Sequence, residues 1–148
     1  MLIPEQILKR DFTFLHRALG NRAFKRIVRQ SLASLESLLY REVLLRQDFS
    51  IIGAARFLQD VTAIQGVIDQ FSSRSGSPLG MPKLREAAAL LNLPLEAHEG
   101  RVPLRDTYTE ITTSTSAAKE ALEHLGMSHL TNREAQVVLE RRLEIGSN

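Results

Sequence analysis

The sequence has no cysteine and no tryptophan, and it has only 2 Tyr and 6 Phe among 148 residues. Without cysteine the chain can form neither a disulfide nor a thiolate zinc site, and it has no thiol nucleophile. This absence fits a cytosolic, reducing location. Because aromatic residues are so few, we expect a core of Leu, Ile, Val and Ala, a composition typical of helical bundles.

Long hydrophobic runs and a strong net charge are also missing. No apolar run approaches the about 20 residues that span a bilayer. Lys9, Arg10 and Asp11 interrupt the start, where a signal peptide would need an apolar core. The net charge of +2 is small for a nucleic-acid-binding protein. We therefore predict neither a membrane-spanning protein nor a nucleic-acid partner.

What is present is an ordinary globular composition, 43% hydrophobic and 24% charged. Apolar residues recur every three to four positions, which predicts an all-α bundle of about six helices. The segment 104–113 is the least regular, because it is rich in β-branched residues. Seven candidate helical segments are expected, this irregular one included, at residues 4–19, 21–47, 51–71, 82–93, 104–113, 117–125 and 131–144.

Start and stop signals mark several helix ends. Gly20 is a stop and Asn21 a predicted N-cap, and Ser50 is another N-cap. Ser114 or Ser116 is the predicted cap of the helix from residue 117, and Pro82 suits a first helical position. Thr131 is followed three residues later by Glu134, the pattern of a capping box. Residues 72–80 and 94–103 are predicted to be flexible loops. They separate helices within a single domain, residues 1–148, which we expect to be a C-terminal fragment of a larger subunit.

No arrangement of residues predicts catalysis. The four histidines His16, His98, His124 and His129 show no HExxH pattern and no i, i+4 pair, so no metal site is expected. The small residues Gly53, Ala54 and Ala55 predict close helix packing, because no strand precedes them as a phosphate-binding loop would require. The sequence therefore predicts no catalytic residue, no cofactor and no small-molecule substrate.

One cluster predicts a binding surface. Arg22, Lys25, Arg26 and Arg29 are spaced to share one face of a helix. Residues 1–60 as a whole hold ten Lys or Arg and six Asp or Glu. This face is interpreted as a docking surface for an acidic helix or an anionic membrane. The alternative is a solvated face whose side-chain stems cover apolar surface.

Three segments together resemble the C-terminal domain of the RINT/TIP family. The first has an aromatic residue and then Gly-Ala and Phe-x-x-Asp, at Phe49, Gly53, Ala54, Phe57 and Asp60. The second is a helix that ends in Leu-Asn-Leu at residues 91–93. The third has a Leu-Gly stop at residues 125–126, then a Leu-Thr-x-x-Glu cap at Leu130, Thr131 and Glu134, and a last helix with Leu139 and Arg141.

The resemblance implies a CATCHR-type rod of stacked helical bundles, with this chain as its distal C-terminal bundle. It implies a non-enzymatic subunit of the Dsl complex, called NRZ in animals, which tethers vesicles in Golgi-to-ER retrograde transport. Its expected partners are other tethering subunits and ER SNAREs, and its expected location is cytoplasmic and peripheral on the endoplasmic reticulum. The matching positions, including Asp60 and Asn92, are interpreted as packing and capping residues.

Three alternatives remain open from the sequence, and the first is a purely structural end-cap of the rod with no partner of its own. The fourth subunit of the COG complex has a similar ending, which would place the chain at the Golgi. A membrane-surface module, in which the basic helix contacts anionic lipid, would also use the cluster from Arg22 to Arg29.

Overall fold

The computed structural model describes residues 4–18, 20–75 and 79–146, and every regular element in these ranges is a helix. The all-α prediction is confirmed. The described residues contain eight α-helices, where about six helices and seven candidate segments were predicted; the eighth arises because the last predicted segment is divided. They are α1 (Pro4–Ala18), α2 (Asn21–Leu38), α3 (Ile51–Ser75), α4 (Pro82–Leu91), α5 (Leu104–Thr113), α6 (Thr115–His124), α7 (Asn132–Leu139) and α8 (Leu143–Gly146), with a π-helical segment η1 (Leu39–Leu44) after α2.

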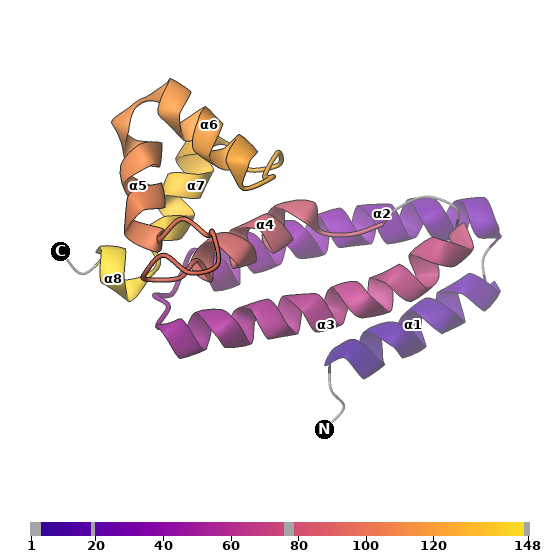
Figure 1. Ribbon diagram of the computed structural model, residues 1–148. Helices are drawn as coiled ribbons and strands as arrows, with labels where there is room; N and C mark the ends of the chain where they lie inside the picture. The colour runs from indigo at the N-terminus through magenta and orange to yellow at the C-terminus, as the bar shows by residue number, and fades with distance from the viewer. Residues whose placement is uncertain (1–3, 19, 76–78, 147–148) are drawn as a thin grey trace.

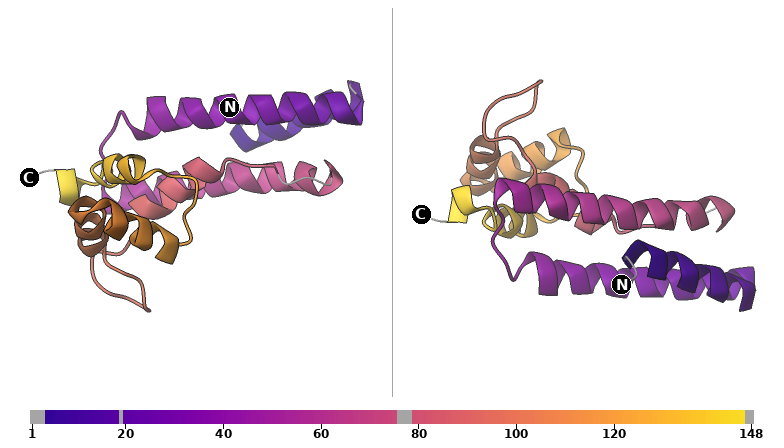
Figure 2. Two further views of the ribbon diagram at one scale, coloured as in Figure 1. Left: turned by 90° about the horizontal axis from the view of Figure 1, so that it is seen from above. Right: turned by 90° about the horizontal axis from the view of Figure 1, so that it is seen from below.

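The long helices form an elongated body, and the short ones gather at one end of it. Figure 1 shows α2 and α3 running alongside each other in opposite directions, with α1 beside the later part of α3. α4 packs on α3, and α5, α6 and α7 pack on one another near the start of α3. The views from above and below agree with this division (Figure 2). The earlier part of α3 is therefore left uncovered by α1.

A wide turn at the end of α2 changes which residues face the core. Phe24, Val28 and Leu32 are buried at four-residue spacing. Four residues of an α-helix turn about 40° past a full circle, so such a row gradually leaves the core side. η1 has more residues per turn, and it returns Tyr40 and Leu44 to the buried side.

The predicted pattern for this helix was partly wrong. We expected one helix to residue 47, with Ile27 and Leu38 in its apolar stripe. The α-helical geometry ends at Leu38, which is 51% exposed, and Ile27 is exposed as well. The N-cap is Gly20, and no side-chain hydrogen bond caps the helix there. A helical wheel predicts neither the exposure of Ile27 and Leu38 nor the end of α-helical geometry at Leu38, because these depend on packing beyond the helix.

α3 begins as predicted and ends later. The Gly53 amide donates to the Ser50 hydroxyl at 3.0 Å, which confirms the N-cap. The helix continues to Ser75, so residues 72–75 are helical where a loop was predicted, and residues 76–78 lie outside the described residues. Ile52 was predicted to be buried but is 72% exposed, because it lies on the side of α3 opposite the buried Ala54.

α3 is also long and apolar enough to meet a simple test for a membrane span. Its residues Ile51–Gln70 pass that test, with 28% of the tested window buried. This corrects the expectation that no such run exists. The core helix of a soluble protein can have the same length and apolarity. Arg56 and Asp60 lie within the segment, while Val61 and Ile68 pack into the core.

α4 is the most deeply buried helix and the centre of the core. Its residues Leu84, Ala87, Ala88, Leu90 and Leu91 are fully buried. The chain enters it past the buried Gln65 side chain, which donates to the Leu79 carbonyl and accepts from the Met81 amide. Pro82 is the first helical residue, as predicted.

The predicted caps of the short helices are confirmed, but the last helix is not continuous. Ser114 caps α6, and Thr131 and Glu134 form the full capping box of α7. We expected one helix to about residue 144. α7 instead ends at Leu139, because Arg142 turns inward to pair with the backbone of Phe49.

Candidate functional site

The four basic residues predicted to bind a partner lie together on the first turns of α2. Arg22, Arg26 and Arg29 are exposed and Lys25 is half-buried. Among the described residues, none of the four forms an ion pair. The opposite side of the same turns is anchored by the buried Phe24. The first turns of α2 therefore hold four cations that have no ion-pair partner among the described residues.

A second surface, which sequence reasoning missed, is an apolar groove between α1, η1 and α3. It has a volume of about 450 Å³. Side chains of η1 and α3 supply its apolar lining, and Glu5 and Asp60 place carboxylates on it. The apolar lining residues are Leu39, Val43, Phe57, Val61, Ala63 and Ile64. We call this the α3 groove. No periodicity signal could have found it, since it depends on the π-helical turn and on where α1 begins.

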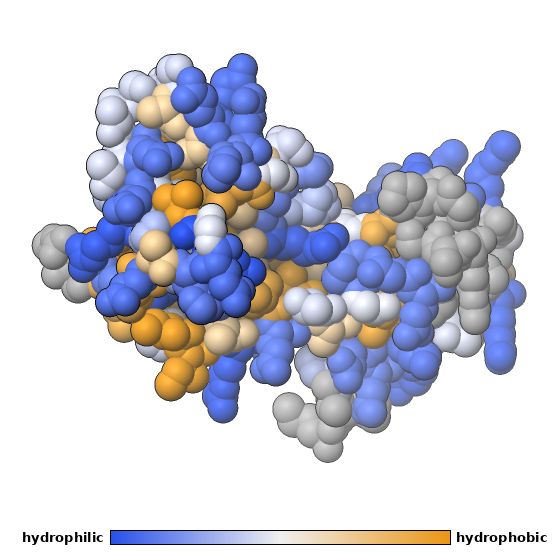
Figure 3. Space-filling view, in the orientation of Figure 1, coloured by the Kyte–Doolittle hydropathy of each residue, from blue (hydrophilic) through white to orange (hydrophobic). Residues whose placement is uncertain are grey.

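Apolar side chains also reach the surface beside the start of α3. Ile51 and Ile52 are exposed there, and so is Leu143, whose amide donates to the Phe49 carbonyl at 3.0 Å. Figure 3 shows a hydrophobic area at the lower left, over the beginning of α3. This end of α3 thus buries Ala54 on one side and presents exposed apolar side chains on the other.

A polar network connects η1, α4 and α7 through Tyr40, Lys83 and Glu134. Lys83 forms an ion pair with Glu134 and lies over the Tyr40 ring, 4.5 Å from its centre. Burial, together with the negative charge of Glu134, raises the pKa of Tyr40 to about 12. Burial alone would raise the pKa of Glu134, but the hydrogen bonds from Lys83 and Thr131 outweigh it and lower that pKa. The network holds helices together and presents no free reactive group.

The C-terminal segment clamps the connection between η1 and α3. The Phe49 amide donates to the Arg141 carbonyl at 2.6 Å. The Arg142 side chain is 2% exposed and donates to the Leu91 carbonyl at 2.5 Å and to Glu144 at 2.9 Å. The hydrogen bond from Arg142 lowers the pKa of Glu144, although the partial burial of this carboxylate would raise it. This clamp fixes the end of α4 and the start of α3 in one arrangement.

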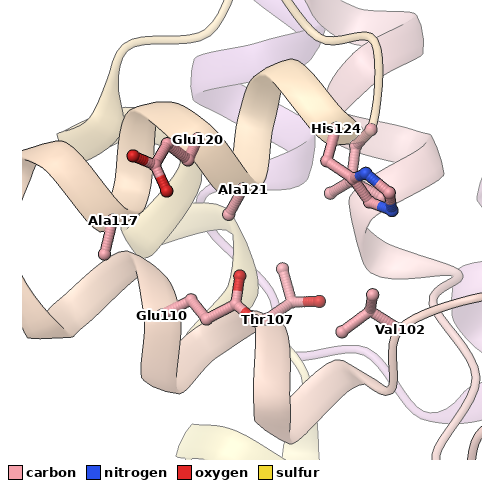
Figure 4. Close-up of a pocket in the computed structure, with 8 residues that line it drawn as sticks. Val102, Thr107, Glu110, Ala117, Glu120, Ala121 and His124 are labelled. Atoms are coloured by element: carbon pink, nitrogen blue, oxygen red, sulfur yellow. The ribbon is translucent and has the colours of Figure 1, made fainter.

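A cavity of about 510 Å³ between α5 and α6 is the best candidate for a catalytic pocket. Its lining residues do not support a catalytic role. Figure 4 shows Thr107 and Glu110 on α5 facing Glu120 and His124 on α6. The buried Thr107 hydroxyl has no hydrogen-bond partner, so no base activates it. Within the described residues this pocket contains no pair of nucleophile and base.

Three histidines have described side chains, and they lie apart from one another. His129 contacts Glu86, which accepts from the His129 amide at 2.9 Å and lies 2.5 Å from its Nδ1. His124 lines the α5–α6 cavity, and His98 is exposed beside Glu99. In the ranges that the structure describes, no three His, Asp or Glu side chains are grouped to hold a metal ion.

Most residues of the three matching segments pack or cap, as interpreted, but Asp60 does not. Ala54 is buried, and its carbonyl accepts from the Asn92 amide side chain at 2.8 Å. Thr131 and Glu134 cap α7. Asp60 is exposed and lines the α3 groove, so it contributes charge to a surface rather than packing to the core.

Comparison with known proteins gives one match. The model of the RINT-1/TIP-1 family matches residues 2–142, nearly the whole chain. No curated protein matches, and no solved structure does.

Proposed function

The chain belongs to the RINT-1/TIP-1 family, and from this premise we propose that it is a non-enzymatic domain of a vesicle-tethering subunit that acts by binding other proteins. The observation that carries the proposal is the family match, because it spans residues 2–142 rather than one short motif. The helical fold supports it, since a bundle with exposed apolar and charged faces suits protein binding.

We assign the tethering step to Golgi-to-ER retrograde transport, at the cytoplasmic face of the endoplasmic reticulum. The partners are other subunits of a Dsl or NRZ-type complex and the cytosolic regions of ER SNAREs. The chain would then be the distal bundle of a CATCHR-type rod, and residues 1–148 one domain of it. The alternative is a COG-type subunit, for which the same surfaces would bind Golgi SNAREs.

The α3 groove is the part of the surface that fits a partner helix. α1 already occupies the neighbouring stretch of α3, so the molecule shows that a helix packs along this side. An amphipathic helix can lay its apolar face into such a groove. Glu5 and Asp60 favour an occupant with basic residues beside its apolar face.

The basic face of α2 acts at longer range. Its cations attract acidic partners before contact and orient them, an effect that weakens as salt rises. A SNARE or tether subunit with an acidic stretch would therefore associate faster at low salt. The groove supplies the apolar contact area, and the basic face supplies the attraction.

The test is a pull-down of the chain with the cytosolic regions of ER and Golgi Q-SNAREs, at low and moderate salt. We expect an ER SNARE to be retained, less strongly at moderate salt. Changing Arg22, Lys25, Arg26 and Arg29 together to Gln should weaken retention several-fold and remove most of its salt dependence. The matched control changes four other exposed arginines to Gln, namely Arg56, Arg85, Arg101 and Arg133.

The groove is tested separately. Ala63→Arg places a long charged side chain in the groove from an exposed helical position, and Gln59→Arg makes the same change on α3 outside it. Loss of retention with the first and not the second supports docking in the groove. Retention of a Golgi SNARE alone would favour the COG-type alternative, and retention of neither would contradict the binding proposal.

A further inference from the structure

The outer face of α1 combines exposed cations with exposed apolar side chains. Phe14 is 69% exposed and Ile7 is 38% exposed. Lys9, Arg10 and Arg17 are exposed on the same helix. A shallow groove on this face is lined by Gln6, Lys9, Arg10, Thr13, Phe14 and Arg17. Neither the family match nor the proposed protein contacts account for this face.

The spacing arranges these side chains in two adjacent rows. Seven residues turn an α-helix by almost two full circles. Ile7 and Phe14 therefore lie in one line along the helix, and Arg10 and Arg17 lie in a second line beside it. A helix that packs on α3 would ordinarily keep polar residues on its outer side. Here an apolar row lies beside a basic row on the solvent side.

This arrangement fits the interface of a membrane with anionic lipids. An amphipathic helix at such an interface puts Phe or Leu among the lipid headgroups while Lys and Arg bind their phosphates and carboxylates. Arg10 pairs with Asp11 at 3.5 Å, but both side chains are largely exposed. Such a pair contributes little, so the guanidinium stays available. The groove on this face is shallow and lined by one helix alone, so it suits a deformable lipid surface better than a rigid partner helix.

We propose that the outer face of α1 is a contact site for an anionic lipid surface, in which Phe14 enters the headgroup region and Lys9, Arg10 and Arg17 bind lipid phosphates. The contact is peripheral and involves neither the basic face of α2 nor the α3 groove. It would orient the bundle on the membrane while those other surfaces bind proteins.

The experiment is co-sedimentation of the chain with phosphatidylcholine vesicles that contain phosphatidylserine, compared with pure phosphatidylcholine vesicles. We expect binding to the anionic vesicles that weakens as salt rises. Changing Lys9, Arg10 and Arg17 together to Gln should lower binding about a hundredfold, since each cation near an anionic surface contributes about fivefold. Phe14→Ser should lower it roughly tenfold.

Two controls separate a specific face from general charge. Changing Arg56, Arg101 and Arg133 to Gln removes the same charge elsewhere and should leave binding within about twofold of the parent. Ile52→Ser removes an equally exposed apolar residue at the far end and should have no effect.

The proposal is overturned if the parent chain binds neutral vesicles as well as anionic ones, if it binds neither, or if the control variants weaken binding as much as the α1 variants. An effect of the cations without any effect of Phe14→Ser would overturn insertion and favour an acidic protein partner for this face. SNARE retention by the α1 variants should match the parent chain, so failure here is distinguishable from failure of the protein-binding proposal.

Discussion

In the clamp around Arg142, we expect the loss of the Glu144 side chain to cost more stability than the loss of the Arg142 charge. Arg142 is 2% exposed, whereas the Glu144 side chain is 23% exposed. Removing Glu144 leaves a buried guanidinium with only the Leu91 carbonyl as a described partner. Removing the charge of Arg142 leaves a carboxylate that water can still reach. We therefore expect Glu144→Ala to destabilise the protein more than Arg142→Met.

The magnitudes follow from the cost of an unpaired buried charge. Breaking a buried ion pair on one side costs about 3 to 5 kcal/mol. Because Glu144 is partly exposed, the lower end applies, about 3 kcal/mol for Glu144→Ala. Arg142→Met keeps the apolar stem and loses the hydrogen bond to Leu91, at a cost of about 1 kcal/mol. The double variant should cost about 1 to 2 kcal/mol, because the unpaired charge has gone with its partner.

Urea unfolding, followed by far-UV circular dichroism, measures the free energies of unfolding of the parent chain, the two single variants and the double variant. Together they form a double-mutant cycle. We expect the double variant to have a larger free energy of unfolding than Glu144→Ala alone. The reasoning is refuted if Arg142→Met is the more damaging single change, or if the two effects simply add.

Three further predictions concern single sites. Gly66→Ala should raise the free energy of unfolding by about 0.5 to 1 kcal/mol in the same urea assay, because no atom lies within 4 Å of the added methyl and alanine is the better helix former. Gly80→Ala should lower it by about 1 to 2 kcal/mol, because its methyl would lie 2.9 Å from the Gln65 amide oxygen and disrupt that side chain's hydrogen bonds; an unchanged midpoint would contradict this role. Since the folded-state pKa of Glu134 is depressed below 4.5, its ion pair should stabilise the fold above that pH and lose this effect as pH falls through the lower pKa. Lys83→Met should make stability fall less steeply in this acidic range, and an unchanged acid-unfolding curve would argue against the pair.

The parts of the fold that could be predicted from sequence are those determined within a few residues. Ser50, Ser114 and Thr131 cap the helices expected of them, because an N-cap bonds to an amide within its own first turn. The start of α4 at Pro82 follows from the fixed backbone angle of proline. The basic face of α2 was likewise predictable, since residues three and four apart share a helix face.

The parts that sequence reasoning missed depend on distant contacts. The wide turn of η1 leaves no local signal, and without it Tyr40 and Leu44 would not be expected on the core side. The break after Leu139 follows from the pairing of Arg142 with Phe49 across the molecule. The α3 groove needs three separate elements, so no single helical pattern contains it. The family itself came from the order of three motifs, each of which is weak alone.

The pairing of the C-terminal segment with residues 45–49 has a consequence for how the chain acquires its structure during synthesis. Arg141 contacts the Leu45 carbonyl, a residue 96 positions earlier in the sequence. Contacts this distant close a large loop and form late in folding. On a ribosome, the beginning of α3 would emerge long before the residues that clamp it, and Phe49, which is buried in the folded chain, would be open to chaperones until translation passed Arg142. Nascent chains that stop before Arg141 should therefore remain bound to chaperones after every long helix has formed.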